Sequence, residues 1–524
     1  MSLSGLSSYA GGVPSPSPLT RSSRETQLAT VLTSAFFIGI ALILVRPLFS
    51  TLSWMIFVQD DLLYYLKVAQ NLAHGHGSTF NGVVQTNGYQ PLWFLLLVAL
   101  SYVTQNPRLI LAFLAATNFI AAAATFILAR KLLGSSGARP LLIFVFAAWT
   151  TLYSVSLFFY GMEVTLTVPL ILGVLCLLHN IPWLEEDMVH TFAFGLLLSA
   201  MVLSRIDTLI LGGLLLAGML VHPALRRLIR ARLLLGVTLG LLPVLLYFLL
   251  NHILFHTWLP VSGMAKELKF NHLPSLEPWR VFFHPLAAAY TLVLLTALLL
   301  LPFLARRLNP IENVIFPAVL VFPFLYYFIL SCVSDWTLWG WYMYPIRTAL
   351  CISFLIFCLW LPSVRILERP IISGLLVLTV FVGLSRLRWT QQQGDIYDAA
   401  LDVQHFAARH AGTYAMGDRA GRVAYLLPNP VIQTEGLMMD RNFLYSIEDQ
   451  LPLRDVLAAY NVNYYIATAY KPFTGCYEAQ EPAKAGEHSA HMRAAFCEPP
   501  LATFMHDGIE TLIFGLKSQV RDAN

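Results

Sequence analysis

Charged residues are scarce in this chain: Asp, Glu, Lys and Arg make up 12% of its 524 residues. A water-soluble domain carries roughly 25% charged residues, so the composition excludes a purely soluble protein. The formal net charge is only +4 and long basic runs are lacking, which argues against a nucleic-acid partner. Internal repeats, which many transporters built from two related halves have, are lacking as well.

Cysteine is also rare, with six residues in the chain. Four of them lie in apolar segments, where we expect them to serve as packing residues. Cys476 and Cys497 lie in the polar C-terminal part. No second CxxC pair accompanies them, which disfavours a zinc site, and they could form a disulfide if this part is extracytoplasmic. The four cysteines in apolar segments are Cys176, Cys332, Cys351 and Cys358.

Hydrophobic residues are abundant, at 57% of the chain. A membrane-spanning helix needs about 20 apolar residues, and a further apolar run at 91–104 is too short. The sequence therefore predicts a polytopic α-helical membrane protein. The candidate spans are 29–49, 109–131, 140–159, 163–181, 189–204, 206–222, 233–253, 284–305, 313–332, 341–362 and 371–388.

Basic residues between the apolar runs orient the predicted spans, because Lys and Arg collect on the cytoplasmic side. The number of membrane crossings between the basic loops places all of them on the cytoplasmic side only if 91–104 does not cross the membrane. This segment then lies as an interfacial helix on the outer surface. About 11 spans then remain, and the loop 59–106 and everything after 389 lie outside. The cytoplasmic markers are Arg21, Arg24, Arg130, Lys131, Arg139, Arg226, Arg227, Arg230, Arg232, Arg306, Arg307, Arg365 and Arg369.

Three regions follow from this pattern. Residues 1–26 are rich in Ser, Gly and Pro and predict a disordered cytoplasmic N-terminus. Residues 27–389 form the transmembrane domain. Residues 390–524 alternate strand-like runs, such as 413–417 and 431–435, with helix-like stretches, which predicts a small extracytoplasmic α/β domain. The Gly-rich turn GDRAG at 417–421 is interpreted as a strand-to-helix connection in preference to a phosphate site.

The polar segment after the first span begins with two adjacent carboxylates, Asp60 and Asp61. Like charges repel, and lipid does not solvate them. Helix capping would explain one of them, but the polar segment continues for some thirty residues, which favours a function. We predict that Asp60 and Asp61 are catalytic, with one accepting a proton from an acceptor hydroxyl and the other orienting it or holding a cation.

The same loop holds further candidates for substrate binding. Tyr64 and Lys67 share a helix face with Asp60, and Lys67 could contact a phosphate or lipid headgroups. His76 lies in a Gly-rich turn, two residues after another histidine. Two histidines at this spacing make a poor pair of metal ligands, so His76 is interpreted as shaping the pocket. Tyr89 belongs to the turn before 91–104.

Other outer-side residues are candidates by their position. Glu163 lies at the outer end of a span, and Arg205 could pair with Asp207 or bind a lipid phosphate. The loop 254–272 supplies His256 and Lys266, as anion-binding cations or as a solvated surface. The aromatic run at 334–345 contains Trp339 and Tyr342 and could be a membrane-interface belt or a sugar-stacking surface.

The segment 60–93 reads DDLLYYLKVAQNLAHGHGSTFNGVVQTNGYQPLW. This pattern resembles the first extracytoplasmic loop of the GT-C superfamily of integral-membrane glycosyltransferases, above all the bacterial polyprenyl-phosphate-sugar-dependent arabinofuranosyltransferases and mannosyltransferases. GMEV at 161–164 is similar to an element of the family's second outer loop. LSRID at 203–207 is similar to an LSRPE-like element, with Ile206 in place of the proline and Asp207 in place of the glutamate.

The resemblance implies a reaction and a location. A sugar would pass from a polyprenyl-phosphate donor to a hydroxyl of a glycan, lipid or protein acceptor, with inversion, at the outer face of the bacterial plasma membrane. Asp60 would be the general base, Asp61 would orient the acceptor, and Glu163 would line the pocket. Arg205, Lys266 and His256 would offset the charge of the leaving phosphate. Some relatives need a divalent cation, and Asp60, Asp61 and Glu163 could hold Mg²⁺ or Mn²⁺ with several waters.

Two other functions stay open at this point. A transporter or flippase for a lipid-linked sugar would also be polytopic, although transporters place charged residues near the membrane midplane, and here the acidic residues lie at the outer ends of spans. A non-catalytic assembly protein with a glycan-binding tail would leave the Asp60–Asp61 pair unexplained.

Overall fold

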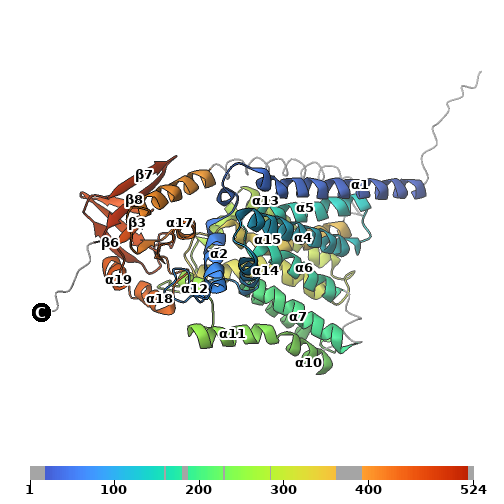
Figure 1. Cartoon of the computed structure of the whole chain (residues 1–524). Helices are drawn as coiled ribbons and strands as arrows, with labels where there is room; N and C mark the ends of the chain where they lie inside the picture. The colour runs from blue at the N-terminus through green and yellow to red at the C-terminus, as the bar shows by residue number, and fades with distance from the viewer. Residues whose placement is uncertain are drawn as a thin grey trace, which may run out of the picture.

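A computed structural model of the chain describes residues 18–158, 161–179, 187–227, 231–283, 285–360 and 392–516. It has two parts, a bundle of apolar helices and a C-terminal domain with a small sheet, which we call the tail domain (392–516). Helix α2 (Asp60–Ala73) lies between them (Figure 1).

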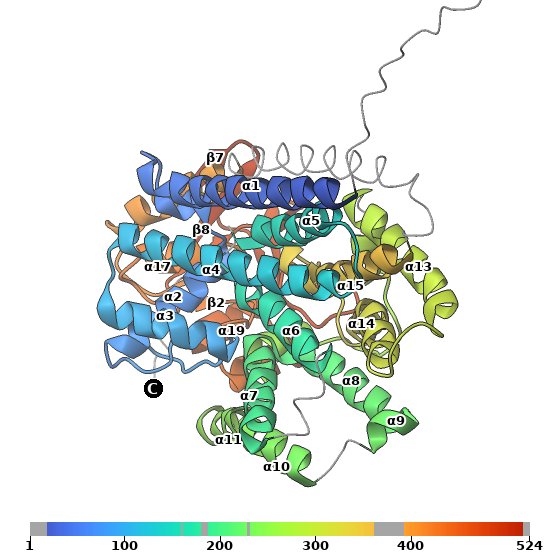
Figure 2. The ribbon, with the colours of Figure 1, turned by 90° about the vertical axis from the view of Figure 1, so that its right-hand side faces the viewer.

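The bundle contains long and short apolar helices. Helices α7, α10 and α11 lie at the edge of the bundle away from α1 in both views (Figures 1 and 2). The bundle helices are α1 (Pro18–Val45), α4 (Pro107–Gly134), α5 (Pro140–Phe158), α6 (Val164–His179), α7 (Met188–Ser204), α8 (Leu209–Val221), α9 (Pro223–Arg226), α10 (Ala231–Gly240), α11 (Leu242–Phe255), α13 (Pro285–Leu304), α14 (Glu312–Val333) and α15 (Tyr344–Trp360).

The prediction of a helical membrane protein is confirmed, but the count of about 11 spans is not. Within the described ranges, five helices are long and apolar enough to cross a membrane, or six if α10 and α11, which meet at 45°, form one bent span. Helices α6, α7 and α8 are apolar but shorter. The predicted span at 371–388 and the predicted boundary at 389 lie outside the described residues.

The loop 59–106 is built from two helices that pack on each other. Asp60 and Asp61 occupy the first turn of α2, where the helix dipole favours negative charge, and Pro91 begins α3 (Pro91–Val103). The prediction of a short helix at 91–104 is confirmed. Thirteen residues rise about 20 Å, which is less than the roughly 30 Å of a bilayer core.

The tail domain holds two sheets, and the prediction of a small α/β domain is confirmed. Its main sheet has the order β2-β1-β3-β8-β7. Strands β2, β1 and β3 run parallel to one another, and β8 runs antiparallel to both of its neighbours, β3 and β7. A second antiparallel sheet has the order β4-β5-β6. The strands are β1 (Tyr414–Met416), β2 (Val431–Gln433), β3 (Tyr464–Ala467), β4 (Tyr470–Phe473), β5 (Cys476–Glu481), β6 (Met492–Phe496), β7 (Ala502–His506) and β8 (Ile509–Gly515).

Four helices pack around the tail domain's sheets. The helix at 392–407 buries Ala400, Val403 and Ala407, whose spacing places them on one helix face. The others are α17 (Ala420–Leu426), α18 (Arg441–Glu448) and α19 (Leu453–Ala459).

Cys476 and Cys497 are joined by a disulfide, as the sequence allowed. Cross-linking residues that are 21 positions apart restricts the unfolded chain and stabilises a fold by about 3 kcal/mol. The double variant Cys476→Ser/Cys497→Ser should therefore lower the unfolding temperature of the full chain in detergent. The free, half-buried Cys332 supplies the control Cys332→Ser, and equal melting of both variants would contradict the prediction.

Candidate functional site

Two adjoining cavities lie where loops of the bundle meet the tail domain. The bundle cavity, of about 250 Å³, is lined mainly by the ends of bundle helices that face the tail domain and by their loops. The tail cavity, of about 500 Å³, lies between the tail domain and the aromatic run at 334–345. Asp61, Tyr64 and Lys266 line both cavities, as do Trp336 and Trp341. These residues therefore mark the junction at which two ligands could meet.

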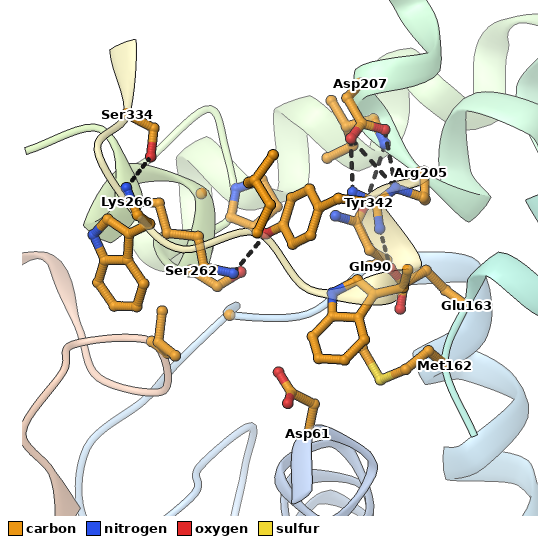
Figure 3. Close-up of a pocket in the computed structure, with 18 of the residues that line it drawn as sticks. Asp61, Gln90, Met162, Glu163, Arg205, Asp207, Ser262, Lys266, Ser334 and Tyr342 are labelled. Atoms are coloured by element: carbon orange, nitrogen blue, oxygen red, sulfur yellow. Dashed lines mark hydrogen bonds and ion pairs between the residues drawn. The ribbon is translucent and has the colours of Figure 1, made fainter. Parts of the chain in front are cut away.

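Asp61 directs its carboxylate into the bundle cavity (Figure 3). The next residues, Leu62 and Leu63, are fully buried and fix the first turn of α2. Asp61 is half-buried, and removal from water raises the pKa of its carboxyl to about 7, against the opposing effect of Lys266. Such a carboxyl group can take up and release a proton near neutral pH.

Lys266 lies on the short helix α12 (Val261–Lys266), on the wall of both cavities. Its Nζ donates a hydrogen bond of 2.7 Å to the Tyr342 hydroxyl and lies 5.8 Å from the centre of the Trp336 ring. Burial lowers the pKa of Lys266, but Tyr342 and Asp61 outweigh burial and the pKa lies above its ordinary value. Lys266 therefore stays protonated at neutral pH and places a positive charge at the cavity junction.

Arg205 is buried in a network of acidic and tyrosine side chains at the far wall of the bundle cavity (Figure 3). Its guanidinium contacts Glu163 Oε1 at 2.6 Å and Asp207 Oδ2 at 2.7 Å. Asp207 also accepts hydrogen bonds from the hydroxyls of Tyr344, at 2.8 Å, and Tyr326, at 3.1 Å. Pairing of Arg205 with Asp207, one of the two predicted alternatives, is confirmed, and Glu163 joins the pair.

Asp60, by contrast, is bound by the tail domain. Its Oδ2 accepts from the backbone N–H of Gly421 and its Oδ1 from that of Arg422, both at 2.8 Å. The Arg422 guanidinium lies 3.8 Å from Asp60 and donates to the carbonyls of Met55 and Val58. GDRAG is the connection from β1 to α17, and the carboxylate that its N–H groups bind belongs to the protein itself.

The loop 484–490 of the tail domain is held between two loops of the bundle, which contain Asp335 and Phe270. The N–H of Gly486 donates to the Asp335 carbonyl at 2.9 Å, and the N–H of Phe270 donates to the His488 carbonyl at 2.9 Å. The N–H of Ala490 donates to the Leu268 carbonyl at 2.8 Å. These backbone bonds make the tail domain a fixed wall of the tail cavity.

The other predicted site residues divide between the cavities and the scaffold. Tyr342 lines the bundle cavity, Trp339 the tail cavity, and Tyr64 both. Lys67 lies outside both linings and donates to the Leu427 carbonyl of the tail domain at 3.3 Å, which ties α2 to that domain.

Like Lys67, three further predicted site residues line neither cavity. His76 is exposed on the turn after α2. Tyr89 is buried, stacked on Phe94 with ring centres 3.6 Å apart, because the turn before α3 packs inward. His256 ends α11 with a left-handed backbone, and its carbonyl accepts from Arg441.

The structure does not bring Asp60, Asp61 and Glu163 together as metal ligands. Within the described ranges there is no group of three or more His, Cys, Asp or Glu side chains arranged to hold a metal ion. Asp60 accepts backbone hydrogen bonds and Glu163 pairs with Arg205, so both carboxylates are already engaged by the protein.

Several cavity residues were not predicted from the sequence. Gln90 accepts the N–H of Ile206 at 3.2 Å and lines the bundle cavity with Tyr65; the polar turn before α3 was a signal for Gln90. Asp418 and Arg419 line the tail cavity, and the GDRAG turn was a signal for them. Glu435 and Lys484 also line it, without any local sequence signal.

Comparison with known proteins adds little to this description. The chain matches no family model and no curated protein. It is similar to the crystal structure of the Archaeoglobus fulgidus oligosaccharyltransferase tethered with an acceptor peptide, with a TM-score of 0.47 and 11% identity, over 83% of this chain and 68% of that chain. A likeness at this level assigns neither an activity nor site residues.

Proposed function

We propose that this membrane protein is a glycosyltransferase that moves a sugar from a polyprenyl-phosphate donor to an acceptor hydroxyl, with Asp61 as the general base. The observation that carries the proposal is the position of Asp61 at the junction of two cavities, opposite the Lys266 cation. The resemblance of segment 60–93 to GT-C enzymes agrees with this activity.

The reaction follows from the groups at the junction. Asp61 takes the proton of the acceptor hydroxyl, and the acceptor oxygen forms a bond to the anomeric carbon of the donor sugar. The bond from that carbon to the phosphate oxygen breaks, and polyprenyl phosphate leaves with the bonding pair. A single displacement inverts the anomeric centre. Lys266, hydrogen-bonded to Tyr342, offsets the charge that develops on the phosphate.

The assignment of the base to Asp61 departs from the assignment that the resemblance implied. Both carboxylate oxygens of Asp60 accept backbone hydrogen bonds from the tail domain. The Asp61 carboxylate has no hydrogen bond to the described residues and faces a cavity. We therefore propose that Asp60 positions the start of α2 and that Asp61, the next residue, performs the proton transfer.

The remaining parts of the proposal concern substrates and location. The donor would be a polyprenyl-phosphate pentose or hexose, as in arabinofuranosyl- or mannosyltransferases, and the acceptor would be a glycan, lipid or protein of the cell envelope. The site and the tail domain would face the outside of a bacterial plasma membrane. The disulfide between Cys476 and Cys497 supports this side, because disulfides persist in oxidising compartments.

A turnover assay on the full chain in nanodiscs tests the function. Polyprenyl-phosphate pentoses and hexoses are offered singly, with a mixture of oligosaccharide acceptors, and release of polyprenyl phosphate is followed by mass spectrometry. We expect release from one donor class and an inverted linkage in the product. Failure of every donor, together with movement of a lipid-linked sugar across liposomes that contain the protein, would support a flippase instead.

The pH dependence of kcat/KM gives a second test. The pKa of Asp61 is raised to about 7, so the ionised base is lost as the pH falls through 7. We expect kcat/KM to fall about tenfold per pH unit below that value and to level off above about pH 8. A profile that is flat between pH 5 and 7 would contradict Asp61 as the base.

A further inference from the structure

We propose that the tail cavity is an acceptor subsite for an uncharged sugar chain, which Glu435 contacts by hydrogen bonding and Trp339 by stacking. The inference rests on the proposed glycosyltransferase function and names its acceptor class. The tail cavity joins the bundle cavity at Asp61 and Lys266. A chain bound there can present a terminal hydroxyl to Asp61.

Glu435 is the first observation that points to a ligand. It follows β2 at the carboxyl end of the parallel strands, is 3% exposed and lines the tail cavity. Its Oε2 accepts from the Gln433 side chain at 3.2 Å, but its Oε1 has no hydrogen-bond partner among the described residues. Buried polar atoms nearly always have a partner, so an unpaired oxygen on a residue of the cavity lining is a candidate acceptor for a ligand donor.

The charge around Glu435 favours an uncharged ligand. Burial, with the nearby charges of Asp418 and Glu481, raises the pKa of Glu435 well above its ordinary value, which favours the protonated form of its carboxyl group. A neutral carboxyl has one donor and one acceptor group, which matches a sugar hydroxyl. Asp418 pairs with Lys484 at 3.1 Å and lies 3.9 Å from Arg419, so this wall carries no large uncompensated charge.

Trp339 is the second and independent observation. Its ring lies nearly parallel to that of Trp341, with the centres 5.9 Å apart and an angle of 10° between the planes. Yet Trp339 is 40% exposed and lines the tail cavity. Ligand sites combine aromatic surfaces with a few placed polar groups, and a flat aromatic face suits the C–H face of a sugar ring.

Binding of neutral oligosaccharides to the full chain in nanodiscs, without donor, tests the subsite by isothermal titration calorimetry. The probes are uncharged pentose and hexose oligosaccharides, with uronic-acid and phosphorylated oligosaccharides for comparison. We expect at least one neutral probe to bind. Glu435→Ala and Trp339→Ala should each raise its Kd about tenfold, whereas Glu435→Gln, which keeps one donor and one acceptor group, should stay within about threefold.

Glu487 supplies the matched control, because it lies exposed on the loop 484–490, and Glu487→Gln should leave the Kd unchanged. Trp339→Ala keeps the test valid if Glu435→Ala fails to fold, since the Trp339 side chain is partly exposed. Absence of neutral-sugar binding, preference for the anionic probes, or equal Kd values in wild type, Glu435→Ala and Trp339→Ala would each overturn the subsite.

The two proposals fail in different ways. If sugar binding depends on Glu435 and Trp339 but no donor is turned over, the subsite stands and the transferase function falls. If transfer occurs and both variants keep the wild-type KM for the acceptor, the transferase stands and the acceptor binds elsewhere.

Discussion

Replacing Asp61 with Asn is expected to lower kcat by about three orders of magnitude, in the range of roughly 10²–10⁴ that a general base contributes. Asn has the same shape but cannot accept the proton of the acceptor hydroxyl. The Asp61 carboxylate makes no hydrogen bond to the described residues, so the substitution leaves no partner unsatisfied. The measurement is single-turnover transfer with the donor identified in the panel assay.

The control for this experiment is the neighbouring residue. Asp60→Asn weakens the hydrogen bonds from Gly421 and Arg422 but leaves the Asp61 carboxylate in place. We expect a smaller loss of kcat in Asp60→Asn, with the pH profile still set by a group of pKa near 7. If Asp60→Asn abolishes transfer and Asp61→Asn retains it, the base is Asp60 and the assignment made here is wrong.

Replacing Arg422 with Met is expected to destabilise the docking of the tail domain by about 3–5 kcal/mol, the cost of removing one partner of a buried charged pair. Arg422 is 1% exposed, and its guanidinium donates to the Met55 and Val58 carbonyls beside Asp60. The substitution leaves these acceptors buried without a donor. Thermal unfolding in detergent, with limited proteolysis of the tail domain, measures the effect.

Arg454 gives the matched control. It pairs with Glu498 at 2.7 Å, but its side chain is 42% exposed, and exposed ion pairs contribute about 0–1 kcal/mol. Arg454→Met should therefore melt close to wild type. If Arg422→Met melts with the control and resists protease equally, Arg422 does not hold the two parts together.

The sequence predicted those parts of the fold that depend on local patterns. The five long apolar helices coincide with runs predicted as spans, and strands β1 and β2 fall within the predicted strand-like runs 413–417 and 431–435. Strands β4, β5 and β6 were missed, because they carry Lys, Pro, Glu, Gln or Arg and lack the period-2 alternation of a half-buried strand. Their place in the fold depends on pairing and on the disulfide.

The sequence predicted only those site residues that a local sequence pattern marks. The adjacent carboxylates at 60–61 and the cation Lys266 mark the cavity junction. Which carboxylate is engaged depends on Gly421, which lies 361 positions from Asp60. No local pattern reports such a contact. Glu435 was missed for the same reason, since its environment is set by Asp418 and Glu481, which only the folded tail domain brings together.

The hydrogen bond between Asp60 and Gly421 can form only late in synthesis of the chain. The two residues are 361 positions apart, and chains grow at about 5–20 residues per second. Gly421 is therefore synthesised roughly 20–70 s after Asp60. During that interval the loop that begins at Asp60 exists without the tail wall of its cavity, so the proposed activity should appear only after the last quarter of the chain has been translated and has docked.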